Sequence, residues 1–304
     1  MAQTQAAIHE AQIPPDSHAA QGGHYFVPQP SIYPFILSGG MFLLALGFIL
    51  LMNKFAPGPW IMIAGAAVIL SVVVRWFGRI IHESQTGAYQ QWEDKSFRYG
   101  MIWFIASEVA FFAAFFGALF YVRNVSVPDL LGLLPAHGFT LYPDYKDLAW
   151  PAAGAGPKNF SFTPMGAWGI PAINTALLLS SGVTVTWAHW AMLKNNRTQL
   201  TLGLGLTIAL GVLFLAFQAY EYHHAYSELG LTMGAGVYGA TFFMLTGFHG
   251  FHVTLGAIML SVVFGRCLKG HFTAERHFAF EGVAWYWHFV DVVWLGLFIF
   301  VYWL

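Results

Sequence analysis

Five ionisable side chains occur in the middle of three long apolar segments, where a charged group is costly. Glu108 lies among phenylalanines, His249 and His252 lie in a second segment, and His288 and Asp291 lie in a third. A charge near the centre of a bilayer costs at least ~2.5 kcal/mol on insertion scales, so such residues usually face the interior of a helix bundle and pair. Their similar depth predicts one polar cluster shared by three helices.

The two histidines of the second segment are three residues apart, so they share one face of a helix. Gly247, Gly250 and Gly256 flank them and are expected to let a neighbouring backbone approach closely. We favour the interpretation that His249 and His252 are hydrogen-bonded core histidines that hold helices together. Metal ligation is the lesser alternative.

The third segment carries a stripe of polar residues on one helix face. Glu281, His288 and Asp291 are separated by seven and by three residues, which are helical spacings. We interpret His288 and Asp291 as a structural hydrogen-bonded pair, with Glu281 on the same stripe.

Glu108 is the only Asp, Glu, Lys, Arg or His between residues 99 and 122. Because apolar surroundings disfavour the anion, we expect Glu108 to be protonated at neutral pH and hydrogen-bonded to His252 in preference to His249. Two charges at this depth would cost more to desolvate than a neutral pair. Our hypothesis is a proton-handling or conformational role, and the alternative is a purely structural carboxyl.

The histidine spacing argues against a redox centre in this chain. Two stacked haems need four ligand histidines at two depths, whereas His249 and His252 are only ~4.5 Å apart along a helix axis. The single cysteine, Cys267, excludes an internal disulfide and any cysteine-based zinc or iron–sulfur site. We therefore expect no metal and no haem bound by this chain.

The composition is that of a membrane protein. Of 304 residues, 57% are hydrophobic and only 9% are charged, against roughly 25% charged in soluble domains. A soluble fold could not hide so much apolar surface, whereas a bilayer is itself apolar. The net charge of −1 gives no basic surface that would attract nucleic acid, so we expect no such partner.

Seven segments are long and apolar enough to cross ~30 Å of hydrocarbon as helices. They predict an all-α, seven-helix transmembrane domain over residues 31–304, after a mobile N-terminal tail at 1–30. A long aqueous loop is expected at 123–169, because that stretch is rich in Pro, Gly and Asp. The predicted helices are 32–52, 60–81, 99–122, 171–193, 200–222, 237–264 and 278–304.

The distribution of Lys and Arg predicts the orientation. Nine of them follow the second, fourth and sixth spans, and four lie on the opposite side. Because cytoplasmic loops carry the excess of positive charge, we expect a cytoplasmic N-terminus and tail, and a periplasmic C-terminus and 123–169 loop. No internal repeat is evident, which argues against a transporter built from duplicated halves.

Several motifs resemble those of the cytochrome c oxidase subunit III family, in the family's order. The most specific is the last-helix segment Ala284-Trp-Tyr-Trp-His-Phe-Val-Asp-Val-Val-Trp294. The others are Arg98-Tyr-Gly-Met101, Ser107-Glu-Val109, Phe111-Phe112, Ser181-Gly-Val-Thr-Val-Thr-Trp-Ala-His189, Tyr238-Gly-Ala-Thr-Phe-Phe243 and Thr246-Gly-Phe-His-Gly-Phe-His-Val253. The resemblance covers roughly residues 30–304.

The resemblance implies a non-redox core subunit of a proton-pumping terminal oxidase that uses cytochrome c and reduces oxygen to water. The partners would be catalytic subunit I, which holds haems and copper, and subunit II. The family's subunit III is held to stabilise the catalytic subunit and to support proton uptake and oxygen access. Glu108 matches the family's carbodiimide-reactive carboxylate and His252 the imidazole near it. We expect a bacterial inner (plasma) membrane location.

The resemblance also implies that helices one and two are split from helices three to seven by a cleft filled with phospholipid. Basic side chains at helix ends attract anionic headgroups. The candidate lipid-binding residues are Arg79, Arg98, Arg266, Lys269 and His271. Two alternatives to the oxidase interpretation stay open: an accessory subunit of nitric oxide reductase, and a stand-alone membrane cytochrome or transporter.

Overall fold

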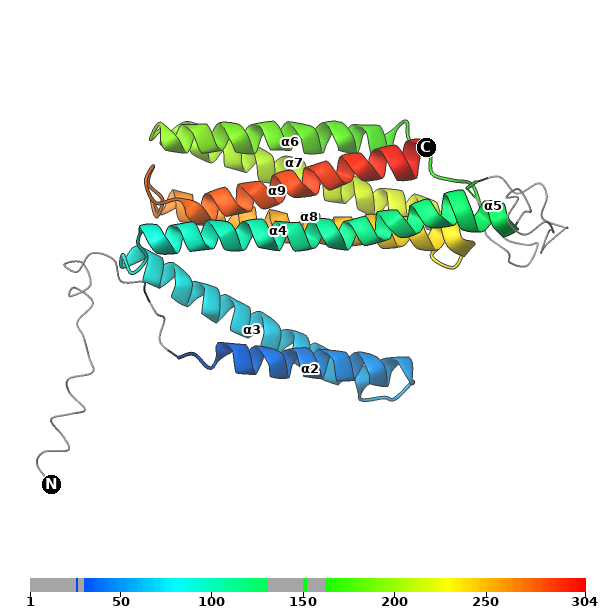
Figure 1. Ribbon diagram of the computed structural model, residues 1–304, viewed down its shortest axis with the longest axis horizontal. Helices are drawn as coiled ribbons and strands as arrows, with labels where there is room; N and C mark the ends of the chain where they lie inside the picture. The colour runs from blue at the N-terminus through cyan, green and yellow to red at the C-terminus, as the bar shows by residue number, and fades with distance from the viewer. Residues whose placement is uncertain (1–25, 27–29, 131–149, 152–161) are drawn as a thin grey trace, which may run out of the picture. The chain divides into compact units, whose positions relative to one another are not determined.

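The computed structural model describes residue 26 and residues 30–130, 150–151 and 162–304, in which the secondary structure is helical and without strands. Seven helices in these residues are long and apolar enough to cross a membrane (Figure 1). The spans are Tyr33–Met52, Gly58–Gln85, Gln91–Asp129, Ile170–Leu193, Arg197–Ser227, Gly236–Leu268 and Phe278–Trp303. The predicted class, an all-α multi-pass membrane protein, is confirmed. Nearly all of the predicted tail at 1–30 lies outside the described residues.

The chain divides into two compact units, Met1–Phe97 and Arg98–Leu304. In the first unit, helices α2 (Tyr33–Met52) and α3 (Gly58–Gln85) form a hairpin in which glycines bring the two backbones together. A Cβ atom on Gly65 would lie 2.5 Å from the backbone nitrogen of Leu44, and one on Gly47 would overlap the backbone of Met62. Small residues of this kind allow the close packing that holds membrane helices together.

Helix α4 (Gln91–Tyr121) begins eight residues earlier than the sequence predicted. The carboxylate of Glu93 accepts hydrogen bonds from the backbone N–H groups of Gln90, at 2.8 Å, and Phe26, at 2.6 Å. This arrangement satisfies a donor at the start of the helix, as a capping box does. The helix therefore extends through polar residues that hydropathy assigned to a loop.

The far end of α4 also differs from the prediction. The chain continues as a π-helix, η2 (Val122–Ser126), and then as α5 (Val127–Leu130). The expected loop at 123–169 is therefore wrong for its first eight residues. Most of its remainder lies outside the described residues.

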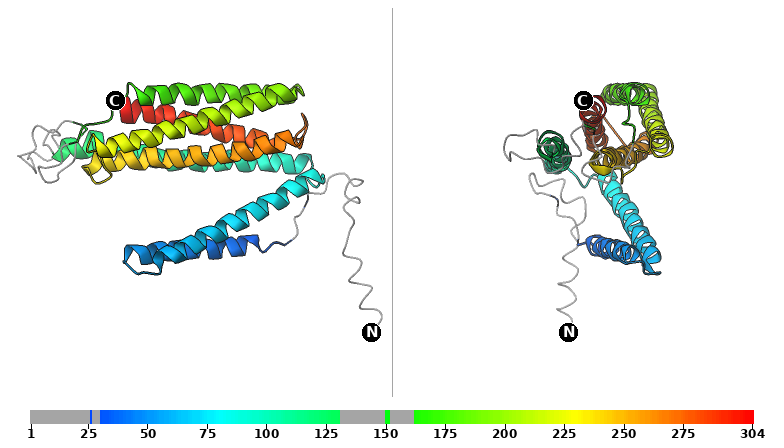
Figure 2. Two further views of the ribbon diagram at one scale, coloured as in Figure 1. Left: turned by 180° about the vertical axis from the view of Figure 1, so that it is seen from behind. Right: turned by 90° about the vertical axis from the view of Figure 1, so that its right-hand side faces the viewer.

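Four helices of the second unit form a closed ring. They are α6 (Ile170–Leu193), α7 (Arg197–Ser227), α8 (Gly236–Leu268) and α9 (Phe278–Leu297), which continues as the π-helix η4 (Phe298–Trp303). Each packs on the next and α9 packs on α6 (Figure 2). Helix α4 meets α8 through Phe111 and Phe248, whose ring centroids are 5.1 Å apart.

Helices α7 and α8 extend beyond the apolar segments from which they were predicted. The side chain of Asn196 accepts a hydrogen bond from the backbone N–H of Gln199 at 3.1 Å, so α7 begins at Arg197 and not at residue 200. Hydropathy marks only the part of a helix that lies in hydrocarbon. Caps and polar turns set the ends.

Trp287 fills the centre of the ring. A Cβ atom on Gly256 would lie 2.8 Å from its indole, and one on Gly211 would lie 2.6 Å from it. The indole N–H donates to the hydroxyl of Ser181 at 2.8 Å, so Trp287 joins α6, α7, α8 and α9. The expected backbone approach at the α8 glycines is therefore wrong, because Gly256 accommodates a side chain and nothing lies within 4 Å of a Cβ at Gly250.

Candidate functional site

Helices α4 and α8 bring Glu108 and His252 together in the second unit. Glu108 Oε2 lies 2.8 Å from His252 Nε2. The rings of Phe111 and Phe112 lie 6.0 and 5.0 Å from the imidazole, centroid to centroid. The imidazole is 9% exposed and the carboxyl side chain 22% exposed in the isolated chain, so the imidazole is the better enclosed partner.

The second nitrogen of His252 fixes how many protons the pair holds. Nδ1 lies 2.6 Å from the carbonyl oxygen of Phe248, which can only accept, so Nδ1 carries a hydrogen. The short contact between Nε2 and Glu108 then needs one further proton. That proton lies either on the carboxyl, giving a neutral pair, or on the imidazole, giving an ion pair. In both states one proton lies in this contact and the pair is uncharged overall.

His249 does not join this pair. Its Nε2 donates to the carbonyl of Val290 at 3.1 Å, and its ring packs between Phe214 and Trp294. The side chain is fully buried, and Nδ1 has no hydrogen-bond partner in the described part of the protein. The sequence placed both histidines on one face, but a separation of three residues still directs them to different neighbours.

The polar stripe of α9 splits into separate contacts. The hydroxyl of Thr186 donates to a backbone carbonyl, so it accepts from His288 Nε2 at 3.2 Å. His288 and Asp291 both lie beside Gly182, but among the described residues no hydrogen bond joins them, so the predicted bond between the two is wrong. Glu281 lies in an ion pair with Arg98 instead.

The predicted lipid-binding cations of the second unit differ in how far their charge is balanced. Arg98 is paired with Glu281, whereas the guanidinium of Arg266 lies over the ring of Phe272 at 4.4 Å. Lys269 is exposed. Partial burial, with the positive charges of Arg266 and Lys269, lowers the pKa of His271 below its usual value. At neutral pH the positive charge here therefore comes from Arg266 and Lys269.

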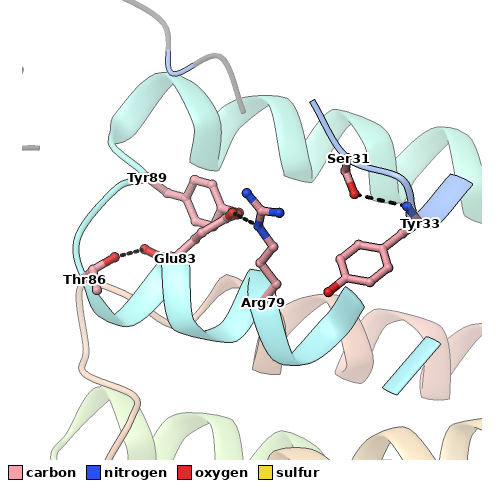
Figure 3. A network of polar contacts seen from close by, with 6 residues as sticks. All are labelled: Ser31, Tyr33, Arg79, Glu83, Thr86 and Tyr89. Carbon is pink, nitrogen blue, oxygen red and sulfur yellow. Dashed lines mark hydrogen bonds and ion pairs between the residues drawn. The ribbon is translucent and has the colours of Figure 1, made fainter. Parts of the chain in front are cut away.

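The fifth predicted cation, Arg79, belongs to a network in the first unit (Figure 3). Its Nε lies 3.1 Å from one carboxylate oxygen of Glu83, and the other oxygen accepts from the Tyr89 hydroxyl at 2.6 Å. Burial and the adjacent carboxylate raise the pKa of Tyr89, so the phenol remains a donor at physiological pH. The charge of Arg79 is therefore largely balanced within its own helix.

Three buried polar side chains of α6 and α7 were not predicted from the sequence. Glu221 on α7 is 1% exposed, and its Oε1 accepts a hydrogen bond from the Tyr302 hydroxyl at 2.6 Å. Gln218 and Asn174 are also buried. Glu221 lies near the end of an apolar segment and reads as an interfacial residue. The available signal was its three-residue spacing from Gln218, which puts two polar groups on one face.

In the described part of the chain, seven helices that could span a membrane, two of which place a carboxyl beside an imidazole, define the class as a multi-pass membrane protein. A family model described as cytochrome c oxidase subunit III matches residues 23–304. Cytochrome c oxidase subunit 3 of Petromyzon marinus is 40% identical over 288 residues, which cover 94% of this chain and 98% of the relative. The protein of the same name from Chondrus crispus is 39% identical over 292 residues, which cover 94% and 96%. The chain belongs to the cytochrome c oxidase subunit III family.

Family membership favours the oxidase interpretation over the nitric oxide reductase and stand-alone alternatives. In the part of the chain that the structure describes, no three His, Cys, Asp or Glu residues are placed to hold a metal ion together.

Proposed function

We propose that this chain is a non-redox core subunit of a proton-pumping terminal cytochrome c oxidase. It binds catalytic subunit I, which carries the haems and copper, and subunit II, in a complex that uses cytochrome c. Its role is to stabilise the catalytic subunit during turnover and to support proton uptake and oxygen access. The support for this proposal is the family match over residues 23–304 together with relatives named cytochrome c oxidase subunit 3.

The Glu108–His252 pair is the observation that carries the proton-handling part of the proposal. A short hydrogen bond of 2.8 Å with one shared proton can take up or release that proton with little movement of either side chain. The surrounding aromatic rings exclude water from the imidazole side. A group of this kind suits proton transfer or a charge-sensitive contact more than it suits binding of an anion.

Replacing Glu108 tests the role in the assembled oxidase. Glu108→Gln retains the size of the side chain and a donor toward His252 Nε2 but removes the titratable proton, so assembly should stay near the wild-type level. We expect slower proton uptake and fewer turnovers before activity is lost. Glu228→Gln is the matched control, because that carboxylate is 67% exposed and pairs with His224, away from Glu108 in the sequence. Wild-type proton uptake and lifetime in Glu108→Gln would contradict the role.

We further propose that anionic phospholipid binds near Arg266 and Lys269 of the second unit. Arg98 in the same unit and Arg79 in the first unit are weaker candidates, each by itself, because their charges are balanced. Each unbalanced cation near a headgroup is worth about 1 kcal/mol. Lys269→Glu replaces this attraction with a repulsion of similar size, about 2 kcal/mol in total, so retention of anionic lipid should fall by more than about tenfold. Lys54→Glu, in the turn between α2 and α3, is the control. Native mass spectrometry of the complex measures the lipid. Equal retention in the two variants would refute the site.

A further inference from the structure

Ten buried polar atoms of the second unit have no hydrogen-bond partner within the described part of the protein. Six of them belong to four side chains of α6, α7 and α8, each at most 6% exposed. These six atoms are Asn174 Nδ2 and Oδ1, Gln218 Nε2 and Oε1, Glu221 Oε2 and His249 Nδ1. The amide of Gln218 lies near the hydroxyl of Tyr302 but outside hydrogen-bond geometry. Leaving one such group unpaired costs about 1–3 kcal/mol, and nearly all buried polar groups in proteins are paired. A group of six therefore requires an explanation.

The register of α6 and α7 puts Asn174 and Gln218 at the same depth. The hydroxyls of Thr184 and Thr207 are 2.8 Å apart across the antiparallel pair. Asn174 lies ten residues before Thr184, and Gln218 lies eleven residues after Thr207. Both belong to the buried faces of their helices. The two amides therefore face the same interior region, toward the end of the unit that holds the C-terminus (Figure 1).

Trp294, which is fully buried, connects this region to the other two side chains. Its indole N–H donates to Thr175, the neighbour of Asn174, at 2.9 Å. Its ring lies 5.2 Å from the ring of His249 and 5.8 Å from that of Tyr302, which donates to Glu221. His249 thus contacts Trp294 directly, whereas Asn174 and Glu221 are linked to it through Thr175 and Tyr302.

The hydrogen-bonding types of the six unpaired atoms indicate which ligand could bind them. Asn174 Oδ1, Gln218 Oε1, Glu221 Oε2 and His249 Nδ1 accept hydrogen bonds, since His249 already donates through Nε2. The two amide nitrogens, by contrast, are donors. A metal cation would satisfy the acceptors and leave the donors unpaired. Water both donates and accepts, and a buried water typically makes about three hydrogen bonds to groups of this kind.

We propose that the second unit contains an internal water-binding site, in which bound waters join Asn174, Gln218, Glu221 and His249 into one hydrogen-bonded network beside Trp294. This network joins α6, α7 and α8 by polar contacts inside the helix ring, and Tyr302 joins η4 to it through Glu221. The inference does not depend on the proposed oxidase role.

Radiolytic footprinting of the complex that contains the chain tests the site. X-rays generate hydroxyl radicals from bound water, and these oxidise aromatic side chains only in their immediate neighbourhood. Trp287 is the matched control for Trp294: both indoles are at most 1% exposed, lie on α9 and donate to a hydroxyl of α6. We expect Trp294 to be oxidised several-fold faster than Trp287, with exposed Trp303 labelled as a positive control. Equal protection of Trp294 and Trp287 would overturn the proposal.

A variant tests whether Trp294 is oxidised through water held by these side chains or through water that reaches the ring by another route. Asn174→Leu together with Gln218→Leu removes four of the six unpaired polar atoms. We expect Trp294 oxidation to fall to the Trp287 level while Trp303 oxidation stays unchanged. Unchanged Trp294 oxidation would show that these groups do not hold the water. If the variant does not assemble, the comparison of Trp294 with Trp287 in the natural chain still decides the question.

Discussion

At the scale of single residues, the Glu108–His252 contact is a balance between two forms of one pair. The ion pair gains Coulomb attraction, but both charges lose hydration, and in apolar surroundings the loss commonly exceeds the gain. Aromatic rings contact the imidazole, and among the described residues its hydrogen-bond partners are Glu108 and the carbonyl of Phe248. We therefore expect the neutral form, with the proton on Glu108, to dominate at neutral pH.

Infrared difference spectroscopy measures the protonation state of this carboxyl directly. We expect a carbonyl band of a protonated carboxylic acid at pH 7 that is absent in Glu108→Gln, and selective reaction of Glu108 with a hydrophobic carbodiimide. The side chain is 22% exposed in the isolated chain, enough to admit the reagent. An ionised carboxylate band that disappears in the variant would show that the ion pair prevails.

The residues that sequence reasoning could pair were those at the same depth in different spans. Glu108 and His252 met this criterion and do contact each other. The His288–Asp291 interpretation failed, because Thr186 of α6 competes for the imidazole and this partner cannot be foreseen from one helix. Glu221 was missed because a carboxylate near a span end looks interfacial unless the opposite helix is known to bury it.

At the scale of helices, apolar length predicted seven spans, but the ends of those spans depend on polar contacts. A span predicted from hydropathy ends where charged residues begin, whereas Glu93 and Asn196 cap helices that continue through polar sequence. The packing inside the ring was likewise hidden. Glycines on α7 and α8 accommodate one tryptophan of α9, and only the three-dimensional structure shows this contact.

Substituting single glycines of α8 tests this packing. Gly256→Ala places a methyl group 2.8 Å from the Trp287 ring, and overpacking of this kind typically costs 1–3 kcal/mol. We expect a lower thermal unfolding temperature for Gly256→Ala. Gly250→Ala is the control on the same helix, since nothing lies within 4 Å of its Cβ position, and it should be neutral or slightly stabilising. Similar unfolding temperatures for the two variants would contradict the close packing of Trp287 against Gly256.

At the scale of the whole molecule, the distribution of side chains is that of a protein solvated by lipid. Large apolar residues are exposed, such as Phe35 at 81% and Trp103 at 75%, whereas Asn174, Ser181 and Thr207 are fully buried. Polar groups meet inside because hydrocarbon offers them no partner. The direction in which the chain spans the membrane is a proposal that rests on the Lys and Arg distribution. The bacterial inner-membrane location is a proposal that rests on the family resemblance.

The orientation can be tested with single cysteines in a Cys267→Ser background. Ala56, in the turn between α2 and α3, and Thr198, in the first turn of α7, are both exposed. Because the excess of Lys and Arg lies on the side of the α6–α7 turn, that side should be cytoplasmic. We expect an impermeant maleimide to label Ala56→Cys in intact spheroplasts, and Thr198→Cys only after permeabilisation. Labelling of Thr198→Cys alone from outside would show that the chain spans the membrane in the opposite direction, with its N-terminus out.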